Sequence, residues 1–413
     1  MPRIVMQGGF WGPIQCSNSI DVKNEELVKV PILSMVDDKL AVSACGHDSL
    51  SLNAHINAQI ELKKLEFHTP DASGKTKCHK MHVGPTNRVC PDLKVHESSM
   101  IPVEEDTYLG DLVRADGKNT LNIKHRVSKG LGIISQIMRI LETISFGKSY
   151  FQIALSLREA MFINGILTNV EIWYGLTKAE IEQLELVDRL LLRRIFSLPL
   201  STCTEALYLE SDCQDIDTIV KGRRVKYLHN LVNSDEDSML YKFFKAQWEY
   251  PVRGDWVLQC KQDLEDFNLP NQLDYFEGKS KDSFKAAFNR KTKDYVLDKF
   301  NDIKMSHSKM ENLFYYEMKL QEYLKLAELS VDESKLIILW RLRMAKFARN
   351  YGQKNKLCPL CSDHEDTQEK SFQCKKVIKA VEMNVKYNDL FRNPTKKMAK
   401  VLKKIMQLRE NQT

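Results

Sequence analysis

The stretch TKAEIEQLELVDRLLLRRIF, residues 177–196, predicts an amphipathic helix with a defined start. Thr177 and Glu180 have the spacing of a capping box, in which each side chain bonds to the other residue's backbone N–H. Behind them an apolar stripe recurs at intervals of three and four residues, as one face of a helix requires: Ile181, Leu184, Val187, Leu191 and Ile195. The stretch therefore predicts a helix that buries one face against neighbours.

Similar helical patterns continue on both sides of this stretch, from Gly117 to about residue 350. Thr202 and Glu205 repeat the capping spacing in front of ALYLE. Four further segments read as helices: DTIVKGRRVKYLHNLV (217–232), SMLYKFFKAQW (238–248), SFKAAFNRKTKDYVLDKF (283–300) and SKLIILWRLRMAKFARN (334–350). We therefore expect a long helical region in the middle of the chain.

The first 117 residues mix strand and helix signals. In ILSMVDDKLAVS (32–43), two short apolar runs flank Asp37 and Asp38, a pattern that predicts a hairpin with the two acids at its turn. Asp48 has the position of a helix cap before Leu52, Ile56 and Ile60. Residues 74–84 read as one strand and residues 93–113 as two more. Together with the helices that follow, these signals predict an α+β fold.

Composition and charge restrict the class of protein. The chain has 413 residues, a net charge of +6 and ten cysteines. It lacks a signal-peptide pattern and any apolar run long enough to span a membrane. We therefore expect an intracellular protein of a reducing compartment, the nucleus or the cytoplasm, in which a Cys-x-x-Cys motif more often holds metal than forms a disulfide.

Adjacent carboxylates on a rigid hairpin are suited to metal-dependent nucleotidyl transfer, in which two Mg²⁺ ions bind the attacking and leaving oxygens. Around Asp37 and Asp38, the chain carries Gln-Gly-Gly at residues 7–9, Lys-Thr-Lys at 75–77 and Tyr-Leu-Gly-Asp at 108–111. This order resembles the later palm motifs of reverse transcriptases from non-LTR retrotransposons. The region after them, including LREAMFINGILTNVEIWYGLT and AQWEYPVRGDW, is similar to the part that follows the palm in such proteins.

The resemblance implies RNA-templated DNA synthesis with Mg²⁺, an RNA template and a DNA primer. It implies that Asp37 is the firmer metal ligand, with Asp38 beside it. It places Gln7, Gly8 and Gly9 along the template and incoming nucleotide, and Lys75 and Lys77 near the triphosphate. An open alternative for Lys75 and Lys77 is that they are exposed turn lysines after Gly74.

The family has another catalytic Asp on a strand well before the Gln-Gly segment, together with the fingers, whereas Gln7 here follows Met1 by six residues. We therefore expect a truncated reverse transcriptase that is inactive alone, since one hairpin does not complete a two-metal site. Whether the chain is an enzyme is left open. The alternative is a non-catalytic nucleic-acid-binding or helical protein-interaction module derived from a transposable element, of unknown oligomeric state.

The segment KLCPLCSDHEDTQEKSFQC, residues 356–374, predicts a small metal site. Cys358 and Cys361 form a Cys-x-x-Cys pair, and Cys374 supplies a third thiolate. The segment resembles the Cys-Cys-His-Cys knuckle that non-LTR elements carry after the thumb, but Lys370 stands where that knuckle has its histidine. His364 is the nearby substitute. Two alternatives remain open, an irregular zinc site or a decayed knuckle with free thiols.

A strongly basic segment follows. Residues 375–409 contain eleven Lys or Arg and two acids, Glu382 and Asp389. Met398, Val401, Leu402, Ile405 and Leu408 form one helical stripe. The lysines off that stripe are candidates for phosphate contact, with a solvated surface helix as the alternative: Lys396, Lys397, Lys400, Lys403 and Lys404.

The expected organisation therefore has four parts. Residues 1–117 form a partial reverse-transcriptase palm, and residues 118–350 form a helical thumb and connecting region. Residues 351–376 form the candidate zinc knuckle, and residues 377–413 form a basic amphipathic helical tail.

Overall fold

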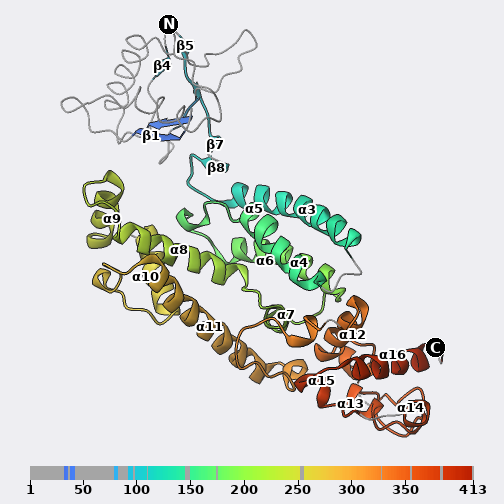
Figure 1. Ribbon diagram of the computed structural model, residues 1–413. Coiled ribbons are helices and arrows are strands. Elements are labelled where there is room, and N and C mark those ends of the chain that lie inside the picture. The colour runs from blue at the N-terminus through green and yellow to red at the C-terminus, as the bar shows by residue number, and fades with distance from the viewer. Residues whose placement is uncertain are drawn as a thin grey trace. The chain divides into compact units, whose positions relative to one another are not determined.

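The computed structural model describes residues 32–35, 38–41, 79–81, 92–95, 98–108, 110–144, 149–173, 175–251, 255–326, 328–353, 356–381 and 385–411. The chain divides into two compact units, Met1–Asn122 and Ile123–Thr413 (Figure 1). The division lies close to Gly117, where the sequence changes from mixed to helical patterns. In the described residues, the named strands all belong to the first unit, and long helices fill the second.

The strands of the first unit are short and pair two by two. They are β1 (Ile32–Met35), β2 (Asp38–Ala41), β3 (His79–Lys80), β4 (Lys94–Val95), β5 (Ser98–Ser99), β6 (Ile101–Pro102), β7 (Glu105–Tyr108) and β8 (Asp111–Arg114). Antiparallel pairs join β1 to β2, β4 to β5 and β7 to β8, whereas β3 and β6 are parallel.

The hairpin predicted around the two acids is confirmed, with its turn one residue earlier than expected. Met35 pairs with Asp38, so the two residues between them are 36 and 37, which lie outside the described part. Asp38 is therefore the first residue of β2 and not a turn residue.

The prediction of two strands over residues 93–113 was wrong, since the described residues there form β4 to β8. The reason is two-residue turns: Val95 pairs with Ser98 and Tyr108 with Asp111. Gly110, in the second turn, has φ +84°, a conformation that glycine adopts without steric cost. The helix predicted after Asp48 lies outside the described residues.

The second unit is helical. Its longer helices are α3 (Thr120–Thr143, which begins just before the division), α4 (Tyr150–Leu157), α6 (Lys178–Phe196), α7 (Thr204–Ser211), α8 (Ile216–Val232), α9 (Met239–Glu249), α10 (Trp256–Asp266), α11 (Lys281–Ser306), α12 (Val331–Arg341) and α16 (Lys396–Glu410). Shorter ones are α5 (Asn164–Ile166), α13 (Gln368–Ser371), α14 (Lys375–Ala380) and α15 (Asp389–Arg392). A π-helical turn, Arg158–Ile163, joins α4 to α5. None of the described helices is long and apolar enough to cross a membrane.

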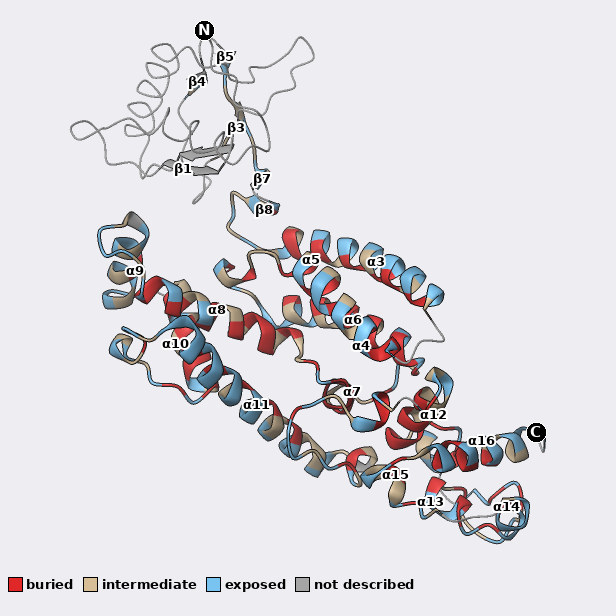
Figure 2. Ribbon diagram, in the orientation of Figure 1, coloured by how far each residue is buried: buried red, intermediate tan, exposed pale blue. Residues whose placement is uncertain are grey.

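Two apolar clusters hold the helical unit together. The larger runs from α3 through α7 to α12 and α16, with Phe162, Trp340 and Leu402 among its fully buried members. The smaller lies where α8, α9, α10 and α11 meet, around Phe267 and Phe288. Figure 2 shows the buried faces of these helices turned toward one another and the exposed faces outward. Because α16 belongs to the larger cluster, it is an integral helix of this unit.

The capping box and apolar stripe of α6 are confirmed. The backbone N–H of Glu180 donates to Thr177 Oγ1 at 3.2 Å, and that of Thr177 donates to Glu180 Oε2 at 2.9 Å. Four of the five stripe residues are buried and Ile181 is half-buried. Local sequence therefore sets both the start of this helix and its buried face.

Two local predictions in the helical region were wrong. Thr202 does not cap α7, because its hydroxyl donates to Pro199 O at 2.7 Å and Cys203 occupies the cap position. The helix expected over residues 334–350 ends at Arg341. Arg343 adopts φ +53°, and the N–H of Met344 returns to Leu339 O at 2.8 Å, which satisfies a terminal carbonyl.

Candidate metal centre

The structure brings together the four residues of the predicted zinc segment. One ligand atom each from Cys358, Cys361, His364 and Cys374 lies within 4.8 Å of the others. Cys358 and Cys374 are buried, whereas Cys361 and His364 are half-buried. Three sulfurs and one imidazole nitrogen at mutual distances of this size are typical of a tetrahedral zinc site.

The first three ligands lie on one tight loop. Leu357 and Glu365 form an antiparallel bridge, and the backbone N–H of Cys358 donates to His364 O at 2.8 Å. Within the loop, Ser362 N–H donates to Cys358 O at 2.9 Å, and Ser362 has φ +57°. These bonds fold the chain back on itself, so that three side chains spaced three residues apart share one side.

Cys374 reaches the cluster from a different element. It follows α13, which Thr367 caps, and it precedes α14, whose Ile378 N–H donates to Cys374 O at 2.8 Å. Lys370, at the histidine position of the family's knuckle, is exposed, and its ammonium contacts Gln373 Oε1 at 3.3 Å. Lys370 is therefore not among the four clustered residues, whereas His364 is.

The imidazole of His364 is oriented as a metal ligand. Its Nδ1 lies 3.1 Å from Glu365 O, which fixes the proton on Nδ1. Its Nε2 is buried and has no hydrogen-bond partner among the described residues. In metal-bound histidines, one ring nitrogen usually donates to a backbone carbonyl or a similar acceptor while the other binds the metal.

The thiols of the cluster have unequal acidity. Burial raises the pKa of the Cys358 thiol to about 11, against the opposing effect of the N–H groups of Cys361 and Leu360. Burial also acts to raise the pKa of Cys361, but the N–H of Asp363 and the thiols of Cys374 and Cys358 outweigh it and lower that pKa. The protein thus makes the Cys361 thiol more acidic than the Cys358 thiol, and a cation would favour the ionised form of all three.

These observations fit Zn²⁺. The donors are three sulfurs and one imidazole nitrogen, the set of a Cys₃His structural site, and Nε2, which has no partner among the described residues, is free to be the fourth ligand. Four protein ligands close the coordination sphere and leave no position for a substrate or a reactive water. The arrangement is therefore that of a structural centre, and it favours the irregular site over the decayed knuckle.

Asp366 and Arg409, which sequence reasoning did not select, connect this loop to α16. Arg409 donates to Asp366 Oδ1 at 2.7 Å and to Oδ2 at 3.0 Å, and Asp366 is 5% exposed. The sequence contained a signal, because Arg409 is four residues after Ile405 and so borders the apolar stripe of α16. A charged residue at the edge of a buried face predicts a buried partner.

The basic helix has the polarity predicted for it. On α16, Met398, Val401, Leu402 and Ile405 are buried and Leu408 is half-buried. All five lysines named as candidates are exposed: Lys396, Lys397, Lys400, Lys403 and Lys404. Of the eleven basic residues between 375 and 409, ten are exposed; Arg409 forms a buried pair with Asp366, and the exposed Lys375 lies 3.8 Å from Asp363.

The remaining predicted site residues are not brought together by the described structure. Gln7, Gly8, Gly9, Asp37, Lys75 and Lys77 lie outside the described residues. Asp38 is described only as the start of β2. The magnesium site and the nucleotide contacts stay predictions.

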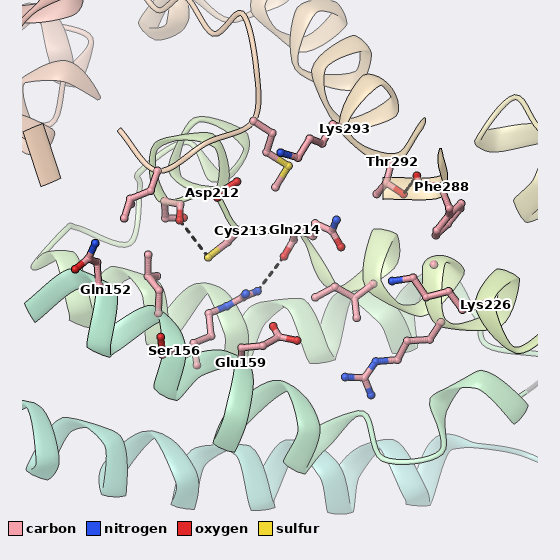
Figure 3. Close-up of a pocket in the computed structure, with 18 residues that line it drawn as sticks. Gln152, Ser156, Glu159, Asp212, Cys213, Gln214, Lys226, Phe288, Thr292 and Lys293 are labelled. Atoms are coloured by element: carbon pink, nitrogen blue, oxygen red, sulfur yellow. Dashed lines mark hydrogen bonds between the residues drawn. The ribbon is translucent and has the colours of Figure 1, made fainter. Parts of the chain in front are cut away.

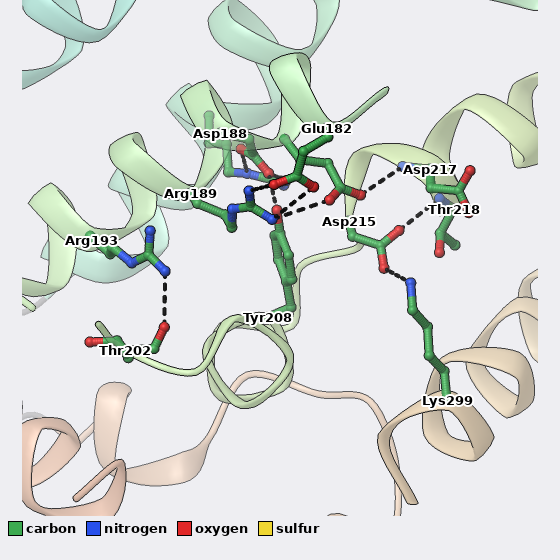
Figure 4. Close-up of polar contacts among 12 residues, drawn as sticks. Glu182, Asp188, Arg189, Arg193, Thr202, Tyr208, Asp215, Asp217, Thr218 and Lys299 are labelled. Atoms are coloured by element: carbon green, nitrogen blue, oxygen red, sulfur yellow. Dashed lines mark hydrogen bonds and ion pairs between the residues drawn. The ribbon is translucent and has the colours of Figure 1, made fainter. Parts of the chain in front are cut away.

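Several charged side chains elsewhere in the helical unit find partners within the protein, whereas a few buried polar atoms, among them Thr218 Oγ1, His307 Nδ1 and Trp340 Nε1, have none among the described residues. Asp188 accepts two bonds from Arg158, at 2.7 and 2.6 Å, and one from Tyr208 at 2.9 Å, while Lys299 pairs with Asp215 at 2.8 Å (Figure 4). Both Arg158 and Asp188 are buried. Such saturated networks are typical of structural polar groups.

A cavity of about 530 Å³ opens among α4, α7, α8 and α11 (Figure 3). Its buried polar groups are also satisfied. Arg158 donates to Gln214 O at 2.9 Å, and the Cys213 thiol contacts Ser211 O at 3.7 Å. Among the described residues, the cysteine loop is therefore the stronger candidate for a ligand site.

Comparison with protein-family models, with curated proteins and with solved structures found no match to this chain. The resemblance to reverse transcriptases accordingly rests on the order of the sequence motifs alone.

Proposed function

We propose that the C-terminal part of this chain is a zinc-stabilised nucleic-acid-binding module. The observation that carries the proposal is the convergence of Cys358, Cys361, His364 and Cys374, with a bare His364 Nε2 aimed at no protein partner. A closed structural site serves to fix a small surface, and the surface available here is basic.

Charge supports a phosphate partner. Ten exposed Lys and Arg lie between residues 375 and 409, and five of them follow the exposed side of α16. Lysines on one helix face neutralise backbone phosphates without reading bases, because they act as point charges. The expected binding is therefore insensitive to sequence and sensitive to salt.

The salt dependence has an expected size. On single strands, log affinity falls with log salt at a slope of about −0.7 per phosphate contact, so four or five contacts give a slope of about −3. The measurement is a salt titration of a fluorescent single-stranded oligonucleotide with the full, zinc-loaded chain. Changing the five α16 lysines to Gln should bring the slope toward zero while the fold is kept, because these side chains are exposed.

A matched control is available in the same unit. Lys124, Lys129, Lys178, Lys281 and Lys285 are also exposed, and changing them to Gln removes the same charge from other helices. If this control flattens the slope as much as the α16 variant, binding is a general charge effect and the assignment to α16 is wrong. Shortening the chain is a poorer test, because α16 contributes buried residues to the core.

A polymerase origin is the second part of the proposal. It is supported by the motif order and by the β1–β2 hairpin, which has Asp38 at a strand start. Mg²⁺ at Asp37 and Asp38, an RNA template and a DNA primer follow from the resemblance. Because one hairpin does not complete a two-metal site, we expect no primer extension by the chain alone. Template-dependent incorporation that disappears in Asp37→Ala would contradict this expectation. The alternative of a helical protein-interaction module stays a prediction.

A further inference from the structure

The cysteine loop and the basic helix are connected through one buried carboxylate. Asp366 lies between the third and fourth candidate ligands in sequence, two residues after His364. Its backbone N–H donates to Lys356 O at 2.7 Å, which closes the base of the loop. Its carboxylate accepts hydrogen bonds from Nη1 and Nη2 of Arg409, at 2.7 and 3.0 Å, and from the Ala348 N–H at 2.9 Å. One residue thus contacts the loop, the turn after α12 and the last turn of α16.

Arg409 is held on several sides. Its Nη2 also donates to Lys346 O at 3.0 Å, and its guanidinium lies 4.1 Å from the centre of the Phe347 ring. The Arg409 side chain is 11% exposed and that of Asp366 is 7% exposed. A bidentate pair with this little solvent contact is among the stronger polar interactions that a protein makes. Breaking it leaves an uncompensated charge in the interior.

A second set of contacts ties α13, which follows the loop, to α12 and to the turn after it. Gln368 Nε2 donates to Trp340 O at 2.9 Å, and Asn350 donates to Gln368 Oε1 at 2.8 Å. The Trp340 ring meets both Phe347 and Phe372 edge to face, and Phe372 is two residues before Cys374. The residues around the fourth ligand are therefore packed against the helix on which α16 lies.

The metal can be added or removed, whereas the contacts of Asp366 and Arg409 belong to the protein itself. Without metal, the cluster holds three thiols and a buried nitrogen that has no partner within the described residues. The free energy of binding a structural metal is also folding free energy for the segment that holds its ligands. Loss of metal should loosen the segment that holds Asp366. The end of α16 near Arg409 then loses its anchor, and Lys403 and Lys404 lie within two turns of that end.

We propose that Asp366 is a positioning residue that couples metal binding at the cysteine cluster to phosphate binding on α16. This inference rests on the proposed function. Metal loading fixes Asp366, Asp366 fixes Arg409, and Arg409 fixes the last turns of the lysine-bearing helix. Since coupling between two sites is reciprocal, bound nucleic acid strengthens metal binding by the same factor.

The experiment uses the full chain as wild type, Asp366→Asn and Glu365→Gln. Glu365 is the matched control, because it is the neighbouring acid on the same loop and its pair with Arg349, at 3.1 Å, is exposed on the arginine side. Each protein is assayed for zinc content and for affinity toward a fluorescent single-stranded oligonucleotide, before and after removal of metal by a chelator.

In the wild type, removal of metal should weaken oligonucleotide binding about tenfold, a usual size for linked sites. Zinc-loaded Asp366→Asn should bind as weakly as stripped wild type and respond little to the chelator, while Glu365→Gln behaves as wild type. Saturating oligonucleotide should also slow zinc release from the wild type and not from Asp366→Asn, an effect that a merely structural role would not produce.

Two results would overturn the coupling. One is a full metal response in zinc-loaded Asp366→Asn, and the other is oligonucleotide binding that depends on the α16 lysines but not on metal. If the wild type binds no oligonucleotide, the nucleic-acid function fails, and hydrogen exchange decides the coupling separately. Metal removal should then still speed amide exchange in the last two turns of α16, and unchanged exchange there would refute the role of Asp366.

Discussion

Glu210 is a buried and His364 a half-buried polar residue of the helical unit, and their surroundings differ. The carboxylate of Glu210 accepts the hydroxyls of Tyr315 and Tyr323, at 2.8 and 2.7 Å, and the Nε of Arg341 at 2.7 Å. Arg341 in turn donates to Leu390 O and Phe391 O, each at 2.8 Å. Around His364, by contrast, one nitrogen has a carbonyl partner and the other has none among the described residues.

The difference separates a structural network from a ligand site. Desolvated polar groups cost free energy unless they are bonded, so a network that satisfies its own members needs nothing further. The thiols of the cysteine cluster contact one another and nearby N–H groups, but His364 Nε2 has no partner in the described part of the chain, and a cation would accept electron pairs from all four groups. The Glu210 network therefore joins α7 to α12 and α15, whereas the cysteine cluster predicts a cation.

The largest expected effect concerns the metal. Cys374→Ser removes a buried ligand and should lower zinc content from about one per chain to nearly none, since three ligands do not close a structural site. Cys260→Ser is the control, because Cys260 is buried in the other apolar cluster, away from the four ligands. Elemental analysis of protein prepared without chelator gives the comparison. Full zinc in Cys374→Ser would show that metal binds elsewhere.

The next effect is on the free energy of unfolding and does not involve the metal. Glu210→Gln leaves Arg341 buried beside a neutral partner and should lower the free energy of unfolding by about 3–5 kcal/mol, with zinc content unchanged. Glu317→Gln is the control, because Glu317 pairs with Lys319 on the surface at 2.6 Å, where ion pairs contribute little. Urea unfolding measures both. Similar values for the two variants would mean that the buried network is not what distinguishes this region.

A smaller effect depends on pH. Burial and the nearby Asp215 carboxylate raise the pKa of Glu185 to about 7, against the opposing charges of Lys299 and Arg189. The folded state therefore keeps a proton that the unfolded state releases above its ordinary pKa of about 4.3. This contribution to stability is complete below that value and is lost as the pH rises toward 7.

Glu185→Gln should remove that pH dependence. The free energy of unfolding of the variant, relative to that of the wild type, should therefore rise by about 1–2 kcal/mol between acidic and neutral pH. Urea unfolding at several pH values provides the measurement. Glu182→Gln, on the same helix and also in contact with Arg189, is more exposed and should leave the wild-type slope in place. A wild-type slope in Glu185→Gln would assign the pH dependence to another group.

The sequence predicted what depends on local pattern. The start and buried face of α6, the pairing of residues 32–35 with 38–41, and the polarity of α16 all follow from spacing within one element. The four metal ligands were also identified, because Cys-x-x-Cys and a nearby His lie on one loop. Each of these features is decided by residues close together in the chain.

What was missed depends on partners far away in sequence. Asp366 and Arg409 are 43 residues apart, and Glu210 and Arg341 are 131 apart, so no local pattern identifies the partner of either arginine. The end of α12 at Arg341 depends on the left-handed backbone conformation of Arg343. The residue types around that position do not predict such a conformation. Thr202 has the spacing of a cap, but the preceding turn uses its hydroxyl.

The most direct test of the contrast between the two polar sites is X-ray absorption at the zinc edge of the purified full chain. The account predicts a first shell of three sulfurs at about 2.3 Å and one nitrogen at about 2.0–2.1 Å. In His364→Ala the scattering from the outer atoms of the imidazole ring should disappear, while the three sulfurs remain. A zinc shell without sulfur, or imidazole scattering that persists in His364→Ala, would contradict the assignment of Cys358, Cys361, His364 and Cys374 as the metal centre.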